Sequence, residues 1–519
     1  MTKPIKAARL FPLLLTTVLL SALGCTDLTE TPSSAITPEN FYRNEGEVLG
    51  GLASVYAQLR GVTGDYWDAT EVSSDEIVVP TRGSDWYDNG QWLELHRQTW
   101  TASSPGVGFM NGAWNSAFAG IARANVLLDA LQRVAVPNQA AIVAELRTLR
   151  GFFYYQLLDF FGGVPIVTDL AIKARARATR PELFSFIETE LLDASADLPA
   201  HWPAASNGRL TKGAADAILA SMYLNAGVWT KETGVSATAY NTCLGVQVSG
   251  GVDACQAAIN AADRIINSGE YSLAASWKSN FAADNQTSPE NIMVVKFLNK
   301  PDLGLNFIMR SLHYNQLTGG TPWNGHATTA QIYTAFDAND QRRQMWLEGP
   351  QSNVETGVPV NDRSGNPLVF TDSIRDVTAA TEGEGPRPYK FPADPNRPEP
   401  QTNGNDYTVF RLAEIYLIKA EALNEQSAGS AAALALVNTL RARVFEPDVP
   451  LAAIDRAALL RERLFELATE GKRRSDLIRH GHYTDAWDYK AAGTPNLILM
   501  PIPQGQLDAN PLLVQNTGY

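Results

Sequence analysis

Four long segments repeat apolar residues at three- and four-residue spacing, and this periodicity constrains the fold more than any other feature of the sequence. The segments are AAIVAELRTLRGFFYYQLLDFFG, ADAILASMYLNAG, YTVFRLAEIYLIKAEALNE and AALLRERLFELATEGKRRSDLIRHG. Such spacing gathers apolar side chains on one face of an α-helix. The sequence therefore predicts a mostly α-helical protein.

Three of these predicted helices place a small residue one turn before a tyrosine. The pairs are Gly151 and Tyr154, Ala220 and Tyr223, and Ala413 and Tyr416. Helix-pair repeats of the tetratricopeptide type combine small and large residues in this way. The pairs are irregularly spaced, and residues 61–115, 299–330 and 349–408 lack periodicity. We expect an interrupted tetratricopeptide-like helix-pair scaffold with long inserted loops, which are usually functional or disordered.

The N-terminus has the pattern of a secretory signal. Basic residues precede an apolar run from Leu10 to Leu20, and small residues then lead to Cys25. The run is too short for a typical membrane-spanning helix. We predict a lipoprotein signal peptide over residues 1–24 and a lipid-anchored tether over residues 25–40. The alternative is an ordinary signal peptide with an incidental cysteine.

Charge and cysteine content narrow the ligand class and the compartment. The formal net charge of −13 becomes −16 once the three basic residues of the signal are removed, so nucleic acid and other polyanions are disfavoured as ligands. Cys243 and Cys255 lie twelve positions apart in a chain expected to leave the cytoplasm. A disulfide between them is expected to stabilise the chain by about 3 kcal/mol, and two buried free thiols are the alternative.

Two polar loops carry large aromatic residues. GSDWYDNGQW and the later TPWNGHATT combine rings with amides, carboxylates and glycines. Sugars present apolar C–H faces ringed by hydroxyls, so a sugar-binding surface needs flat rings with hydrogen-bonding groups beside them. The candidate ligand-binding residues are Trp86, Tyr87, Asp88, Asn89, Trp92, Trp323 and Asn324. The alternative for each ring is burial beneath its own loop, and Trp67, nearby, is expected in the core.

The sequence contains no recognisable catalytic or metal-binding motif. G-x-S-x-G, H-E-x-x-H and P-loop patterns are absent, and a metal site at His480 and His482 would lack a third ligand. We therefore expect that histidine pair at the surface, at a helix end. Acidic and basic residues at helical spacing near the C-terminus are expected to form a structural network. They are Glu462, Glu466, Glu470, Arg473, Arg474 and Arg479.

Several blocks, in order, resemble the SusD/RagB family of surface lipoproteins, which help Bacteroidota capture nutrients, usually glycans. LRTLRGFFYYQLLDFFGGVPIV is similar to its most recognisable N-terminal motif, and LMPIPQGQLDANPLLVQNTGY is similar to its C-terminal signature. GRLTKGAADAILASMYLNAG and LLRERLFELATEGKRRSDLIRHG resemble blocks between them. The resemblance implies an N-terminal region over residues 41–270 and a C-terminal region over residues 271–519 that together form one body.

The resemblance also implies a function. A member of this family would bind a glycan at the cell outer membrane, held by its N-terminal lipid and facing outward. It would act as the lid of a SusC-like TonB-dependent transporter, with no catalysis, cofactor or metal. A peptide or other non-sugar nutrient is the first alternative ligand. A surface glycan hydrolase is the second alternative.

Overall fold

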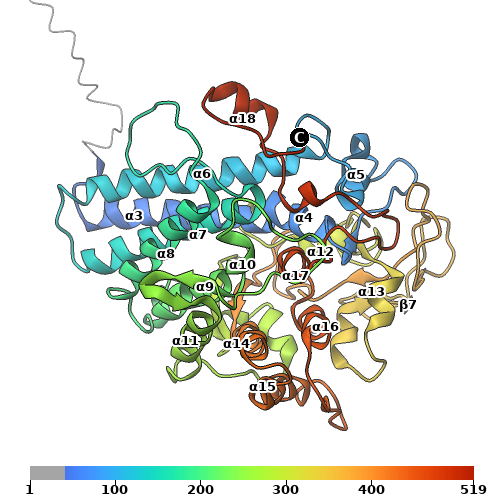
Figure 1. The fold of residues 1–519 in the computed structure, drawn as a ribbon. Helices are drawn as coiled ribbons and strands as arrows, with labels where there is room; N and C mark the ends of the chain where they lie inside the picture. The colour runs from blue at the N-terminus through green and yellow to red at the C-terminus, as the bar shows by residue number, and fades with distance from the viewer. Residues whose placement is uncertain (1–40) are drawn as a thin grey trace, which may run out of the picture. The chain divides into compact units, whose positions relative to one another are not determined.

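The fold is built mainly from α-helices, which confirms the predicted fold class (Figure 1). The structure is a computed structural model that describes residues 41–519, and Tyr42–Tyr519 form one compact unit. The predicted signal peptide, Cys25 and the tether lie outside the described residues. The helices are α3 (Glu45–Tyr56), α4 (Asp65–Val72), α5 (Gln91–Arg97), α6 (Val107–Ala130), α7 (Gln139–Phe161), α8 (Arg180–Ser195), α9 (Lys212–Leu224), α10 (Ala226–Trp229), α11 (Ala254–Ile266), α12 (Phe307–Ser311), α13 (Ala330–Ala335), α14 (Leu412–Gln426), α15 (Ala431–Arg441), α16 (Arg456–Leu467), α17 (Arg473–His480) and α18 (Gln504–Ala509).

Helices pack against their neighbours as α6 on α7, α7 on α8, α9 on α11 and α14 on α15. The small residue of one predicted pair explains a close approach, since a Cβ on Gly151 of α7 would lie 3.4 Å from Leu191 of α8. Helix α7 is followed by Gly162, which has a φ of 71°. Glycine adopts this φ without the steric cost of a side chain. The tetratricopeptide-like character of the pairs stays a prediction.

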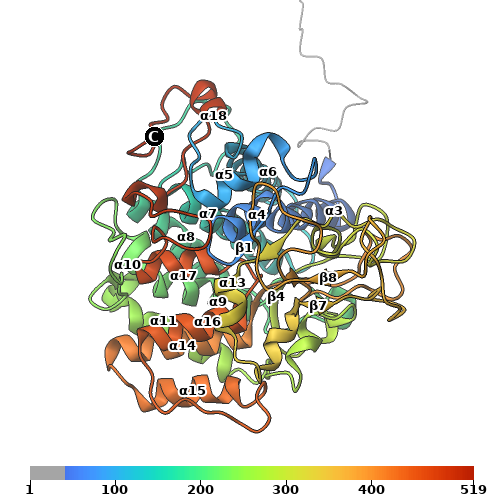
Figure 2. The same ribbon diagram turned by 90° about the vertical axis from the view of Figure 1, so that its right-hand side faces the viewer.

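Short antiparallel strands tie the inserted loops to the helices, and several of them face the viewer in Figure 2. The pairs are β1 (Ile77–Val78) with β5 (Ala327–Thr328), β2 (Gln247–Val248) with β3 (Val252–Asp253), β4 (Asn291–Val295) with β10 (Tyr407–Arg411), β6 (Trp346–Leu347) with β9 (Arg387–Pro388), and β7 (Gly349–Pro350) with β8 (Val369–Phe370). Most of these strands have two residues, so they fix the ends of loops rather than build a sheet.

One large hydrophobic core runs through the unit, and Trp67 is buried in it, as predicted. The C-terminal segment packs onto this core, where the backbone N–H of Met500 donates to the carbonyl oxygen of Phe160 at 2.7 Å. Cys243 and Cys255 form a disulfide with a Cα–Cα distance of 5.0 Å. Across residues 41–519, no helix has the length and apolar character required to cross a membrane.

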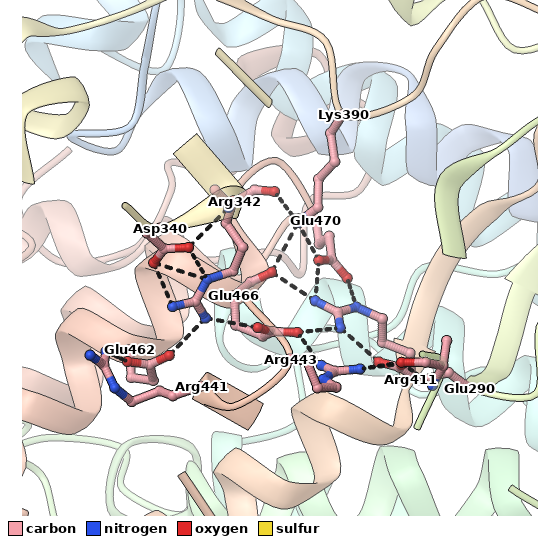
Figure 3. Close-up of polar contacts among 12 residues, drawn as sticks. Glu290, Asp340, Arg342, Lys390, Arg411, Arg441, Arg443, Glu462, Glu466 and Glu470 are labelled. Carbon is pink, nitrogen blue, oxygen red and sulfur yellow. Dashed lines mark hydrogen bonds and ion pairs between the residues drawn. The ribbon is translucent and has the colours of Figure 1, made fainter. Parts of the chain in front are cut away.

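A cluster of buried charges surrounds Glu466 on α16, and we call it the charge cluster (Figure 3). Its members are Glu290, Asp340, Arg342, Lys390, Arg411, Arg441, Arg443, Glu462, Glu466 and Glu470. Five basic groups therefore meet five acidic groups. Burial raises the pKa of Glu466, but Arg411, Arg443 and Arg342 outweigh that effect and hold the value well below its usual range.

The charge cluster links segments that are far apart in the sequence. Arg342 bridges Glu462 and Glu466 at 2.7 and 2.8 Å. Arg411, which ends β10, contacts Glu466 at 2.7 Å and Glu290 at 2.8 Å. The regularly spaced glutamates of α16 thus bridge to neighbouring segments, which confirms the predicted structural network.

Candidate functional site

The two aromatic loops come together because the strands beside them pair. Ile77 lies opposite Thr328 in the antiparallel pair of β1 and β5. One aromatic loop follows β1 and the other precedes β5, so the pairing sets them side by side. The indole Nε1–H of Trp86 then donates to the carbonyl oxygen of Trp323 at 2.5 Å. Two residues 237 positions apart are thereby joined directly.

The Trp86 ring packs closely against Gly325, Trp92 and His326, and we call this packing site the seat of Trp86. Its ring lies so near Gly325 that a Cβ there would come within 2.3 Å of ring atoms. Trp92 and His326 meet the ring edge to face, with centroid distances of 5.3 and 5.6 Å. Glycine at position 325 is therefore required by the approach of the indole. Trp86 stays half-buried, so part of its ring is accessible.

A buried polar triad supports this seat from below. His326 lies 3.1 Å from Asp68 through its Nε2, and Arg310 contacts the same carboxylate at 3.1 Å. The carbonyl oxygen of Arg310 accepts the backbone N–H groups of Gly325 and His326. Burial lowers the pKa of His326, so its ring is neutral at pH 7. These contacts hold the backbone of Gly325 and His326, the two residues against which the Trp86 ring packs.

The loop after Trp86 projects polar and aromatic groups outward. Tyr87 has 59% of its surface exposed, and Asp88 and Asn89 are also exposed. Trp86, Asp88 and Asn89 have φ values of 64°, 40° and 58°. Side-chain-bearing residues seldom adopt positive φ, and such strain concentrates at functional sites. The loop is held in an unfavourable shape that displays Tyr87.

Trp92 and Asn324 do not lie at the surface, so the prediction that they contact a ligand needs correction. Trp92 is 7% exposed, because α5 starts at Gln91 and turns its ring into the core. Its Nε1–H donates to Asp88 at 2.8 Å. Asn324 is fully buried and accepts from the guanidinium of Arg387 at 3.1 Å. Both residues position the loops.

Trp323 is half-buried, and its backbone carbonyl oxygen accepts the indole N–H of Trp86. Its backbone N–H donates to the carbonyl oxygen of Met309, and its ring packs on a small cluster containing Met309 and Leu312. Trp323 therefore supports the loops through its backbone and its packing, and the residue as a whole stays partly accessible.

Sequence reasoning missed a group beside Trp86 that centres on Tyr314. The Tyr314 hydroxyl donates to Asp85 at 2.5 Å, and the Arg363 guanidinium lies 4.0 Å from the Tyr314 ring centre. Arg363 also pairs with Glu382 and reaches Asp85 at 3.3 Å. Tyr314 belongs to the same stretch of sequence as Trp323, but nothing in the long loop of residues 349–408 marked Arg363.

Electrostatics keep this group charged and fixed. Burial raises the pKa of Glu382, but hydrogen bonds from the Arg363 backbone and from His313 outweigh it and bring the value to about 2. Burial raises the pKa of Tyr314 to about 12, and its hydrogen bond to Asp85 adds to the rise. At neutral pH the group therefore holds an ionised Glu382 and a neutral phenol. We call Trp86, Tyr87, Tyr314 and Trp323 the aromatic platform.

The histidine pair differs from expectation. His480 is buried and lies 2.9 Å from Glu421, whereas His482 is exposed and contacts Asp485 at 2.7 Å. The expected surface location is therefore wrong for His480. It is buried because the end of α17 packs against Tyr240, whose ring centre lies 4.7 Å away. In the described part of the chain, no three His, Cys, Asp or Glu side chains are grouped as metal ligands.

The chain thus combines a helical scaffold with two adjoining loops that carry aromatic and amide side chains. Two family models match the chain, one described as SusD family over residues 271–519 and one described as starch-binding associating with outer membrane over residues 52–224. The chain belongs to the SusD/RagB family, as the sequence motifs predicted.

Relatives match over nearly the whole chain. The starch-binding protein SusD of Bacteroides thetaiotaomicron is 25% identical over 91% of this chain and 89% of its own length. The SusD-like protein P25 of Formosa agariphila is 24% identical over 97% of this chain and 98% of its own. The solved structure of a laminarin-binding SusD-like protein superposes with a TM-score of 0.73 at 25% identity, covering 92% of this chain and all of that one.

Proposed function

We propose that the protein binds a glycan on the aromatic platform and delivers it to a transporter, without cleaving it. The observation that carries the proposal is the junction of the two loops, where Trp86 donates to the Trp323 carbonyl and both residues are only half-buried. A sugar ring stacks through its C–H face on such rings. Asp88 and Asn89 are exposed beside them and offer hydrogen-bond partners to hydroxyls.

A neutral glucan is the first ligand to test. The solved relative at 25% identity is named for binding laminarin, and the B. thetaiotaomicron relative is named for binding starch. The strong negative charge of the chain favours a neutral polymer over a polyanion. Beside the rings of the platform, the exposed amide of Asn89 and the exposed carboxylate of Asp88 can both hydrogen-bond to the hydroxyls of an uncharged sugar.

The proposed setting is the outer membrane. Family resemblance supports a lipid on Cys25, an outward-facing body and a SusC-like TonB-dependent transporter as partner. In this arrangement the protein acts as a lid that closes over the transporter with the glycan bound. The family model described as associating with the outer membrane supports the location.

The test is affinity electrophoresis of the chain from Thr26 onward through gels containing laminarin, starch or another neutral polysaccharide. This form contains the whole compact unit Tyr42–Tyr519. We expect retardation by a glucan that Trp86→Ala and Trp323→Ala each weaken and the double variant abolishes. Trp202→Ala is the matched control, because Trp202 is also half-buried and lies under Arg209, away from the platform.

Other outcomes would redirect the proposal. Retardation that survives the double variant would place the sugar elsewhere on the molecule. Binding of peptides but of no polysaccharide would favour a non-sugar nutrient on the same scaffold. Release of reducing ends over time by the pure protein would show a hydrolase and contradict binding without cleavage.

A further inference from the structure

A pocket lies apart from the aromatic platform, at the start of α8. It has a volume of about 510 Å³ and is lined by the beginning of α8, the loop that starts at Glu232, and two stretches of the C-terminal segment. Arg180, Arg177 and Asn496 contribute side chains to its wall. None of the residues of the aromatic platform lines it. The volume is within the range of small-ligand sites and sufficient for a single sugar unit.

Arg180 is buried in this wall without a partner. The residue is 3% exposed, and its Nε–H has no hydrogen-bond acceptor. Within residues 41–519, its guanidinium makes neither a hydrogen bond nor an ion pair. Its stem is clamped against α7, since a Cβ on Gly162 would lie 3.1 Å from the Cγ and Cδ atoms of Arg180. A buried guanidinium without an acceptor is costly, and native proteins rarely leave one unsatisfied.

Nearby carboxylates do not neutralise this charge. Glu232 accepts the backbone N–H of Arg180 at 2.8 Å, at the N-terminus of α8, rather than its side chain. Asp159 is paired with Arg474 at 3.0 Å. Arg177 donates only to oxygens of uncharged groups, so it adds a second positive charge to the wall. Burial lowers the pKa of Arg180 to about 10, so it remains protonated at neutral pH.

We propose that this pocket binds a small organic acid, with the Arg180 guanidinium receiving its carboxylate. A guanidinium offers parallel N–H donors whose spacing matches the two carboxylate oxygens. The remaining volume accommodates the rest of the molecule beside Asn496, and a sugar acid has the size and hydroxyls to fit.

The probe is sodium glucuronate, measured by isothermal titration calorimetry on the chain from Thr26 at constant ionic strength. We expect binding to the wild type and at least tenfold weaker binding to Arg180→Met, because a hydrogen-bonded charge pair is lost. Sodium acetate is the second probe. Binding of both supports a carboxylate site, and binding of glucuronate alone supports a site for sugar acids. Binding of neither overturns the proposal.

Two further variants and one stability measurement distinguish loss of the ligand contact from a folding defect in Arg180→Met. Glu232→Gln keeps an oxygen for the Arg180 backbone N–H but removes a competing charge, so glucuronate should bind several-fold more tightly. Trp86→Ala should leave glucuronate binding unchanged, which separates this site from the aromatic platform. The ligand-free Arg180→Met protein should melt at the same or a higher temperature, since an unpaired buried charge is gone. Equal glucuronate affinity in wild type and Arg180→Met, or weaker binding by Glu232→Gln, would refute the assignment.

Discussion

The charge cluster around Glu466 and the aromatic platform around Trp86 both depend on residues distant in sequence. The two regions differ in how far their polar groups are buried and paired. In the charge cluster, five basic and five acidic groups pair with one another, and all except the partly buried Arg443 are buried. In the platform and the loop that carries it, Tyr87, Asp88 and Asn89 are exposed, and three residues other than glycine have positive φ. In the first region every charged side chain has an oppositely charged partner within the protein. The second keeps rings and amides available.

This difference separates residues that stabilise the fold from residues that remain available to a ligand. A buried charge that loses its partner is very unfavourable, so the charge cluster specifies one arrangement of α16, β10 and the loop before β6. Substitutions in the charge cluster should therefore lower stability, and substitutions in the platform should lower binding.

The largest expected effect follows from removing the central carboxylate of the charge cluster. Glu466→Gln leaves Arg342, Arg411 and Arg443 without a shared negative charge. We expect the free energy of unfolding in urea to fall by about 3–5 kcal/mol, the cost of breaking a buried ion pair. Asp129→Asn is the control, because its pair with Arg133 is exposed and should change stability by less than about 1 kcal/mol. A loss below 1 kcal/mol in Glu466→Gln would contradict this role.

The second prediction concerns the seat of Trp86. In Gly325→Ala, the added methyl would overlap the indole, so the ring must leave its place. We expect glucan retardation to weaken at least tenfold, with a stability loss of about 1–3 kcal/mol, typical of overpacking. Gly50→Ala is the control, because an added Cβ there meets nothing within 4 Å. If Gly325→Ala bound glucan as wild type does, the observed position of Trp86 would not matter for binding.

The sequence predicted the helical scaffold well because helical periodicity is a local property. The segments around Gly151, Ala220 and Ala413 became α7, α9 and α14, and the helix stop at Gly162 was visible in the motif FFGGVP. The spacing of the α16 glutamates also indicated a network. Their partners could not be foreseen, because Arg342 and Arg411 approach from segments with no periodic relation to α16.

The candidate site was predicted only in part. The loops were identified from composition, which does not reveal the orientation of a ring. Trp92 was assigned to the loop, but WLEL already has the spacing of a helix face that turns inward. Asn324 was assigned to the ligand from the composition of its loop. Its burial could not be foreseen, because it depends on Arg387, 63 residues away. Tyr314 and Arg363 meet only in the folded chain.

A third prediction tests a buried pair of acids that joins the two regions. Glu71 and Glu76 flank the end of α4 and accept backbone N–H groups from Gly471 and Thr469, just after α16. Burial raises the pKa of both, and the charge of Glu71 raises that of Glu76 further. The folded state therefore holds protons that the unfolded state releases above about pH 4.3. Stability should fall as pH rises from there through the raised folded values.

Glu76→Gln removes one ionisation while keeping an oxygen for the Thr469 N–H. Urea unfolding of both proteins at pH 5 and pH 9 should show the wild type losing about 1–2 kcal/mol more than the variant over this interval. Acids that do not contact Glu76 titrate in both proteins and cancel in the difference. Parallel losses in the two proteins would mean that Glu76 ionises in the folded state as easily as in the unfolded state.

The smallest expected effect is at Arg363, which shares features with both regions. Arg363 is 50% exposed and rests on Tyr314, so it resembles the charge cluster in its ion pairs but lies at the surface of the platform. Arg363→Ala should change the free energy of unfolding by less than about 1 kcal/mol. Loss of its contact with the ring should weaken glucan binding about two- to fivefold, as for an exposed cation–π contact. Arg375→Ala, an exposed arginine paired with Glu384, should leave binding unchanged. A loss as large as that of Gly325→Ala would instead show that Arg363 contacts the glycan itself.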